Sequence, residues 1–190
     1  MAAPPPTKSG SVSRFLRYRG CVRWPIAIWL LLATSVACDD DDFCDPGEPC
    51  ACRGGHECLL SCEDDGCNPT CSSLEHCAAE CPDNCSFECS DAQECSSSCG
   101  DDCNVSCHDA VGCTASCGER CHFECHDMNR CKVRAGDHST IECSQYTRCD
   151  VECTGSCRVS CNNPSGCSVT CLGAAAPSQC TDGSQACGAC

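Results

Sequence analysis

The chain has 190 residues and a formal net charge of −15; 32 residues are cysteine, and only 4% are aromatic. So few large side chains cannot build an ordinary hydrophobic core, and a cysteine fraction above roughly 10% in an exported chain indicates a disulfide scaffold. All 27 acidic residues lie at or beyond Asp39 with only 7 of the 12 lysines and arginines, so this part carries a net charge of −20. That charge argues against nucleic acids and anionic lipid surfaces as partners.

Residues 1–37 are predicted to be a signal peptide. A basic segment ends at Arg23, and an uncharged apolar run of 14 residues follows at 24–37. This length suits the apolar region of a signal peptide and is shorter than the roughly 20 residues that span a bilayer. The sequence therefore predicts export.

The apolar run ends in Ser35-Val36-Ala37-Cys38. Small residues before a cysteine at this place resemble the lipobox of bacterial lipoproteins, here with Ser35 where the motif usually has Leu. The resemblance implies that Cys38 carries a lipid and becomes the mature N-terminus, so that the protein is anchored in a membrane. Ordinary cleavage after Ala37 and an uncleaved anchor are the alternatives. Without Cys21 and with Cys38 acylated, 30 of the 32 cysteines remain, an even number that can form 15 disulfides, which favours lipidation.

The segments on either side of the cysteine repeat are predicted to be caps. Residues 38–43 form the lipid anchor and an acidic spacer, and residues 44–57 space their cysteines irregularly among prolines and glycines, as a stapled N-terminal cap would. Residues 172–190 lose the repeat again and are predicted to be a C-terminal cap or a tail, because terminal repeats are atypical.

Between residues 58 and 171, cysteines recur at intervals of 4, 4, 4 and 6 residues, and so the pattern repeats every 18 residues. Internal repeats of this length indicate a solenoid. Each repeat contains Cys-x-Φ-x-Cys twice, where Φ is mostly apolar, and residues at i, i+2 and i+4 of an extended chain face one side. The sequence therefore predicts an all-β fold, a small disulfide-rich parallel β-solenoid of 18-residue rungs.

Two columns of apolar residues fill this predicted core. Small residues in one column accompany large ones in the other, as with Ala79 and Phe87 or Ala115 and Phe123. Such complementary layers suit a narrow core. A helix is disfavoured because glycine or proline interrupts every rung. The alternative fold is an irregular string of disulfide loops, since disulfides need Cα atoms within about 7 Å and packed sheets usually stand about 10 Å apart.

The rung that starts at Cys131 suggests how the cysteines pair. Its second and third cysteine positions are Ala135 and Ser139, lost together, as expected if these positions normally bond each other. The predicted bonds across the short turns are Cys81–Cys85, Cys99–Cys103, Cys117–Cys121 and Cys153–Cys157. The outer cysteines are left open: Cys131 pairs either with Cys143 in its own rung or with Cys125 across the long turn.

Other chemistry of the cysteines is disfavoured, and no cofactor is predicted. Metal–thiolate clusters favour short chelate spacings, whereas spacings of three and five intervening residues dominate here. Cys187 and Cys190 form a Cys-x-x-Cys pair, but the strand–helix context of a redox motif is missing, so a structural bridge is predicted.

The long turns carry one candidate metal site. Asp91, Asp109 and Asp127 recur at the same turn position, with His108 and His126 before two of them. In a solenoid they would stand roughly 4.8 Å apart. The period is similar to that of calcium-binding RTX β-rolls, but the Gly-Gly-x-Gly-x-Asp motif is absent, and turn formation is the favoured role of these aspartates.

The outward-facing strand residues vary in charge from rung to rung. They include Thr114, Ser116, His122, Glu124, Lys132, Arg134, Asp150, Glu152, Arg158 and Ser160. The plan resembles that of insect antifreeze proteins, but their regular threonine array is missing, and no enzyme motif is present. We expect a non-catalytic structural or binding module of the bacterial cell envelope that contacts a protein or glycan ligand. The alternative is a cysteine-rich lipoprotein that sequesters metal or buffers redox state.

Overall fold

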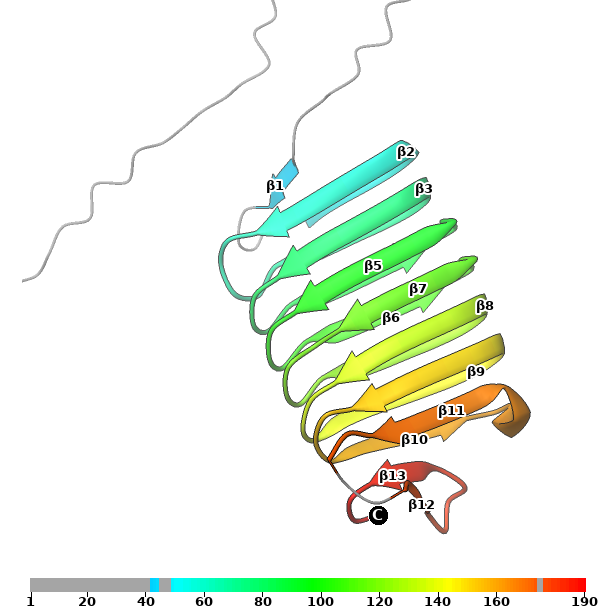
Figure 1. Cartoon of the computed structure of the whole chain (residues 1–190). Coiled ribbons are helices and arrows are strands. Elements are labelled where there is room, and N and C mark those ends of the chain that lie inside the picture. The colour runs from blue at the N-terminus through cyan, green and yellow to red at the C-terminus, as the bar shows by residue number, and fades with distance from the viewer. Residues whose placement is uncertain (1–41, 45–48, 174–175) are drawn as a thin grey trace, which may run out of the picture. The chain divides into compact units, whose positions relative to one another are not determined.

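The 18-residue repeat folds, as predicted, into an all-β solenoid whose rungs stack one on the next (Figure 1). The computed structural model describes residues 42–44, 49–173 and 176–190, and no α-helix occurs among them. The elements are β1 (Asp42–Cys44), β2 (Pro49–Cys62), β3 (Asn68–Cys81), β4 (Ser86–Ser90), β5 (Glu94–Cys99), β6 (Asn104–His108), β7 (Gly112–Ser116), β8 (His122–Ala135), β9 (Ser139–Cys153), β10 (Cys157–Cys161), the 3-10 turn η1 (Pro164–Gly166), β11 (Cys167–Cys171), β12 (Ser178–Gln179) and β13 (Gln185–Cys187). The alternative of irregular disulfide loops is thereby excluded.

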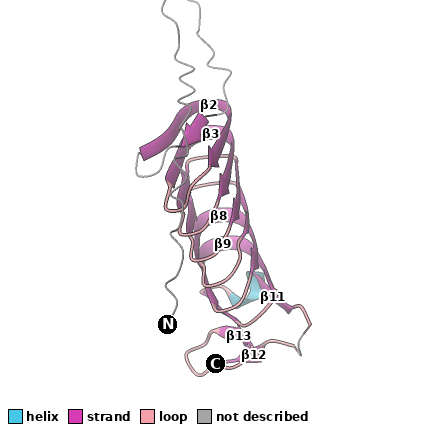
Figure 2. Ribbon diagram, turned by 90° about the vertical axis from the view of Figure 1, so that its left-hand side faces the viewer, coloured by secondary structure: helices cyan, strands magenta, loops and turns pink. Residues whose placement is uncertain are grey.

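Each rung contributes one strand segment to each of two layers. One layer runs through β4, β6 and β10 and the other through β5, β7 and β11, while β2, β3, β8 and β9 continue through the long turn and belong to both. The parallel register is one repeat, so that Cys89 pairs with Cys107 and Cys107 with Cys125. Short turns join the layers on the left of Figure 1 and face the viewer in Figure 2; long turns join them on the right of Figure 1.

The apolar residues between the cysteines lie in the space between the layers. Phe87 and Phe123 are buried, as are Ala79 and Ala115 in the opposite column. Cysteines complete the same buried cluster. The complementary columns predicted from the sequence therefore do form the core.

The turns repeat their backbone conformation as well as their length. In most of them one non-glycine residue has a left-handed backbone, with φ of 51–59° in the long turns (Ser73, Asp91, Asp109, Asp127, Gln145) and 55–58° in the short turns (Asn84, Asp102, Arg120, His138). Asparagine and aspartate tolerate this conformation better than other non-glycine residues, which explains their frequency here.

The two ends of the solenoid differ in detail from the caps that the sequence predicts. Regular pairing starts at Pro49 rather than after residue 57, because β2 pairs with β3 along most of its length. Cys52 and Cys58 lie 19 residues before their partners Cys71 and Cys77. Because of this extra residue, a search for an 18-residue period does not find this rung. At the other end β13 pairs antiparallel with β10 and with β12, so residues 176–190 cap the layer that contains β10.

Candidate functional site

Disulfides close the long turns along one edge of the solenoid. They are Cys52–Cys58, Cys71–Cys77, Cys89–Cys95, Cys107–Cys113, Cys125–Cys131, Cys143–Cys149 and Cys161–Cys167. Their Cα atoms stand 6.3–6.6 Å apart, so the body is as thin at this edge as disulfide bonding requires. The sequence left two partners open for Cys131. The structure pairs it with Cys125 across the long turn, and Cys143 is bonded to Cys149 instead.

Cysteines form a second column at the short turns. Cys117–Cys121 and Cys153–Cys157 are bonded as predicted, with Cα atoms 6.5 and 6.0 Å apart. The first rung has the equivalent bond, Cys62–Cys67. In the rung without these cysteines, Ala135 is fully buried, and the Ser139 hydroxyl accepts a hydrogen bond of 3.1 Å from the backbone N–H of Cys121. A polar contact between rungs there replaces the disulfide within the rung.

The structure differs from the prediction at Cys81, Cys85, Cys99 and Cys103, which are free thiols. Each contacts neighbouring rungs. Cys85 Sγ lies 3.4 Å from Cys67 Sγ, and the thiol of Cys103 donates to the carbonyl oxygen of Pro82 at 3.3 Å. These thiols occupy the positions that are disulfide-bonded in the rungs on either side. The two rungs that contain them therefore have cysteines at the short-turn positions but no disulfide between them.

The four thiols differ in acidity because of their mutual hydrogen bonds. The hydrogen bond with Cys85 is the main cause that raises the pKa of Cys81 to about 12. The hydrogen bond with Cys103 raises the pKa of Cys99, and the same contact lowers the pKa of Cys103 to about 7. Cys103 is therefore the thiol that ionises first, and a thiolate is the form that attacks disulfides or binds metals.

The remaining cysteine predictions fall in three places. Cys187 and Cys190 do not bond each other: Cys187 bonds Cys171, and Cys190 bonds Cys180, so both serve as structural bridges. Cys38 lies outside the described residues. Within the described part of the chain, groups of three or more potential ligand atoms within 4.8 Å consist of cysteines alone, and every such group includes a disulfide-bonded pair.

The aspartates and histidines of the long turns do not gather into a shared site. The rings of His108 and His126 stack with centroids 5.0 Å apart, but each Nδ1 bonds the aspartate that follows it, Asp109 or Asp127, at 3.2 Å. Asp91, Asp109 and Asp127 have φ of 52–54°, as expected of turn-forming residues. The side chains thus pair within their own turns instead of converging on an ion.

The fold raises the pKa of His108, a partly buried histidine of the long turns. Burial lowers the pKa of its imidazole, but hydrogen bonds to Asp109 and Glu88 outweigh burial and raise the pKa above its ordinary value. Nε2 lies 3.3 Å from Glu88 Oε1, a contact that joins two neighbouring rungs.

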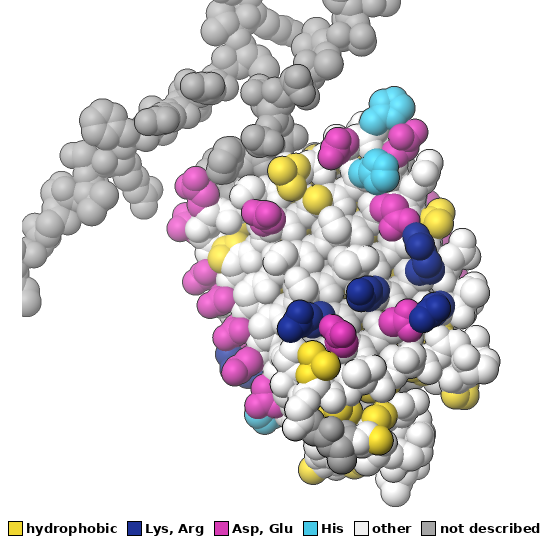
Figure 3. Space-filling view, in the orientation of Figure 1, with side chains coloured by type: hydrophobic (Ala, Val, Ile, Leu, Met, Phe, Trp, Pro, Cys, Tyr) yellow, Lys and Arg dark blue, Asp and Glu magenta, His cyan; other side chains and the backbone are white. Residues whose placement is uncertain are grey.

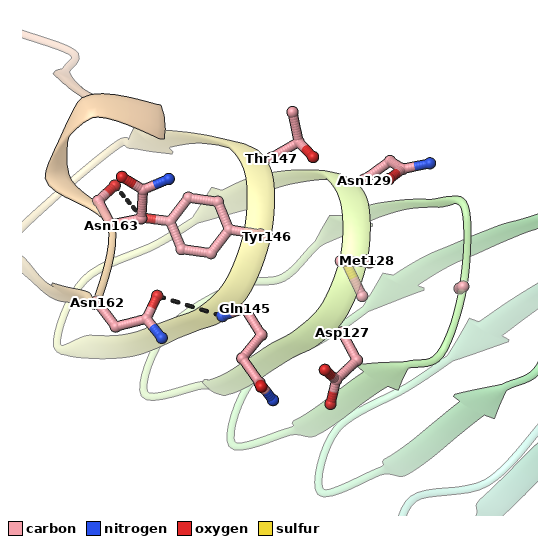
Figure 4. Close-up of a pocket in the computed structure, with 9 residues that line it drawn as sticks. Asp127, Met128, Asn129, Gln145, Tyr146, Thr147, Asn162 and Asn163 are labelled. Carbon is pink, nitrogen blue, oxygen red and sulfur yellow. Dashed lines mark hydrogen bonds between the residues drawn. The ribbon is translucent and has the colours of Figure 1, made fainter.

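A hollow of about 560 Å³ opens on the long-turn edge near the C-terminal end (Figure 4). Its polar lining comes from three successive turns: Asp127, Asn129, Gln145, Thr147, Asn162 and Asn163. Its apolar lining consists of Ala110, Met128 and Tyr146, whose side chains are almost fully buried. A polar rim thus surrounds a buried apolar surface.

The last long turn shapes this hollow by folding differently from those before it. Instead of a left-handed residue it has η1, and a Cβ atom on Gly166 would lie 2.6 Å from the carbonyl oxygen of Thr147, too close to be tolerated. The hydroxyl of Tyr146 donates to the carbonyl oxygen of Asn163 at 2.6 Å, which ties this turn to the rung before it. Burial raises the pKa of Tyr146, so the phenol stays protonated.

Sequence reasoning singled out only Asp127 among the residues of the hollow, and as a metal candidate. The signals were present in the turn sequences. The buried turn position holds Ala92 and Ala110 and then the larger Met128 and Tyr146, and the next turn contains Asn-Asn-Pro. The sequence could not show that the 3-10 turn η1 lies next to Tyr146.

Comparisons with protein families, with curated proteins and with solved structures found no match for this chain. The described residues contain no helix long and apolar enough to cross a membrane.

Proposed function

We propose that this protein is an exported, lipid-anchored structural and binding module of the bacterial cell envelope without catalytic activity. One observation carries the proposal: a disulfide closes each long turn from Cys52 to Cys167. Disulfides of this number form and persist in an oxidising, exported environment. The cysteines therefore serve as the frame of a stiff body whose outer surfaces are free for contact.

The charged surface supports a binding role more than a catalytic one. Figure 3 shows a row of acidic side chains along the short-turn edge. Two aspartates of the short turns hold neighbouring rungs together, because Asp83 and Asp101 each accept a hydrogen bond of 2.8 Å from a backbone N–H one rung further on. On the broad face Lys132 is in register with Asp150, and Arg134 with Glu152, so opposite charges lie side by side on neighbouring rungs.

The alternative function, metal sequestration or redox buffering, keeps one supporting observation. Cys81, Cys85, Cys99 and Cys103 are thiols, and Cys103 ionises readily. A storage protein would use most of its cysteines as thiolates, whereas these four form a small set inside a bonded frame. This second function is therefore limited to the middle of the short-turn column.

A free-thiol count combined with an intact mass tests the proposal. Protein purified without reductant should show four thiols, with or without a chelator, and a count of zero would contradict the assignment of these four cysteines as thiols. A diacylglyceryl mass on Cys38 should accompany it, and Cys38→Ala should abolish membrane association. About 30 titratable thiols with metal-dependent folding would establish the storage function instead, and a mature N-terminus elsewhere would refute the anchor.

A further inference from the structure

We infer that the hollow formed by the last three long turns is a binding site for a neutral oligosaccharide. The inference rests on the proposed binding function and names the ligand class for one surface. The hollow has about 560 Å³, within the range of roughly 300–1,000 Å³ usual for small-molecule sites. Its polar residues come from successive rungs, which stand about 4.8 Å apart, so the rim spans about 10 Å, long enough for a disaccharide.

The lining excludes strongly charged ligands. It contains one carboxylate, from Asp127, and no lysine or arginine, so nothing in it neutralises an anion. Oδ2 of that carboxylate is already bonded by His126 Nδ1 at 3.2 Å, and the described residues offer no cluster of carboxylates there that would hold a cation. A neutral ligand fits this balance.

The remaining polar groups suit hydroxyl groups, which both donate and accept. Carboxamides come from Asn129, Gln145, Asn162 and Asn163, and each offers a donor and an acceptor. The backbone N–H of Gln145 donates to Oδ1 of Asn162 at 3.2 Å, so the amide group of Asn162 is fixed with its NH₂ turned away from that bond. Figure 4 shows this contact at the rim of the hollow. A fixed donor beside an acceptor is the arrangement that binds vicinal hydroxyls with little loss of side-chain entropy.

Apolar residues form the base of the hollow but are only 5–6% exposed, so the polar rim makes most of the contact with a sugar. A sugar ring has a face of C–H groups, which pack on apolar or aromatic side chains. Met128 and Tyr146 line the hollow beneath the polar rim, and the Tyr146 hydroxyl is satisfied by Asn163, so the ring is held in one position. The amide rim and the single carboxylate match a neutral sugar better than a peptide, whose backbone prefers an open strand edge.

The test uses the oxidised full-length protein and four neutral disaccharides as probes: cellobiose, lactose, mannobiose and N,N′-diacetylchitobiose. Saturation-transfer NMR and calorimetry should detect binding of at least one of them, and no binding of sulfated or uronate-rich oligosaccharides. Asp127→Asn should weaken binding about tenfold or more, because hydrogen bonds to a charged acceptor are the stronger kind, and Asn162→Ala should weaken it severalfold.

Asp91→Asn is the matched control. Asp91 has the same left-handed turn position, with φ of 52° against 54° for Asp127, but does not line the hollow, so its substitution should leave affinity unchanged. Equal losses in both aspartate variants, or no binding of any probe to folded protein, would overturn the inference. In that case the thiol count would be unaffected, so the proposed structural function would stand separately.

Discussion

Individual residues set the spacing of the rungs at the short turns. The backbone N–H of Gly136 donates to the carbonyl oxygen of Gly118 at 2.8 Å, and that of Gly118 to Gly100 at 2.9 Å. A Cβ atom on Gly136 would collide with the carbonyl group of Gly118. Glycine is therefore required here for close approach of two backbones, and the turn adds its own hydrogen bonds to those of the layers.

Ser97 carries a buried hydroxyl that has no hydrogen-bond partner. It occupies the column that elsewhere holds Ala79, Ala115 and Val133, and among the buried side-chain oxygens and nitrogens of the described residues its hydroxyl is the one without a partner. We expect Ser97→Ala to stabilise the protein by about 1 kcal/mol, because the cost of burying an unpaired hydroxyl disappears. Ser98→Ala, an exposed neighbour, is the control and should change the free energy of unfolding by less than about 0.5 kcal/mol. Chemical denaturation measures both, and a destabilised Ser97→Ala would contradict the assignment.

The raised pKa of His108 gives the protein a pH-dependent contact between rungs. Because the folded pKa is above the unfolded value of 6.5, this contact contributes its full stability below that value and loses it as the pH rises through the folded pKa. An NMR titration of the imidazole should give a pKa above 6.5, and Glu88→Gln should lower it by removing one of the two carboxylates. Glu142→Gln, on the same layer but two rungs away, should leave the titration unchanged. A pKa that Glu88→Gln does not move would show that this contact is absent in solution.

At the level of the element, the rung from Cys131 tests how short turns pair their cysteines. Cys117–Cys121 before it and Cys153–Cys157 after it are bonded, while Ala135 and Ser139 stand in the same column. Introducing Ala135→Cys with Ser139→Cys should form a new bond across this turn. A loop of about five residues gives roughly 2 kcal/mol by the entropy model, less about 1 kcal/mol for the lost contact of Ser139 with Cys121.

Thiol counting and denaturant unfolding measure that outcome, with Ser139→Ala as the control that removes only the hydrogen bond and lowers stability. If the two introduced cysteines stay reduced, the prediction is wrong, and this short turn resembles those at Cys81 and Cys99, whose cysteines are free thiols.

The sequence was informative about the elements for a physical reason. Cysteine at i and i+4 with an apolar residue between them fixes both the strand and its inner face, and an 18-residue period fixes the register, so the solenoid could be predicted without a structure. The rung at Cys52 was missed because one inserted residue shifts its period. The hollow was missed because it depends on how the turn at Pro164 folds over Tyr146, a contact between rungs that no spacing encodes.

For the whole molecule, the disulfides and the stacking of rungs have different roles. Hydrogen bonds between rungs repeat along the described body, yet each rung adds only a few apolar core side chains besides its cysteines, such as Ala79, Phe87 and Ala92. A thin core of this kind buries little apolar surface for each residue that it orders, and the ordering costs roughly 1–2 kcal/mol per residue in backbone entropy. Covalent closure of the turns lowers that cost by restricting the unfolded chain.

We therefore expect reduction to unfold the solenoid. Each bridge contributes on the order of 2–4 kcal/mol, so a reductant should abolish the β-sheet circular dichroism signal, whereas a chelator at neutral pH should leave it unchanged. Removal of two bridges by substitution provides the control. Cys171–Cys187 and Cys180–Cys190 fasten only the C-terminal cap. Replacing those four cysteines by serine should therefore leave most of the circular dichroism signal and a cooperative unfolding transition. Retention of the full signal after complete reduction, verified by thiol count, would mean that hydrogen bonding and packing between rungs suffice, and that the cysteines are present for another purpose.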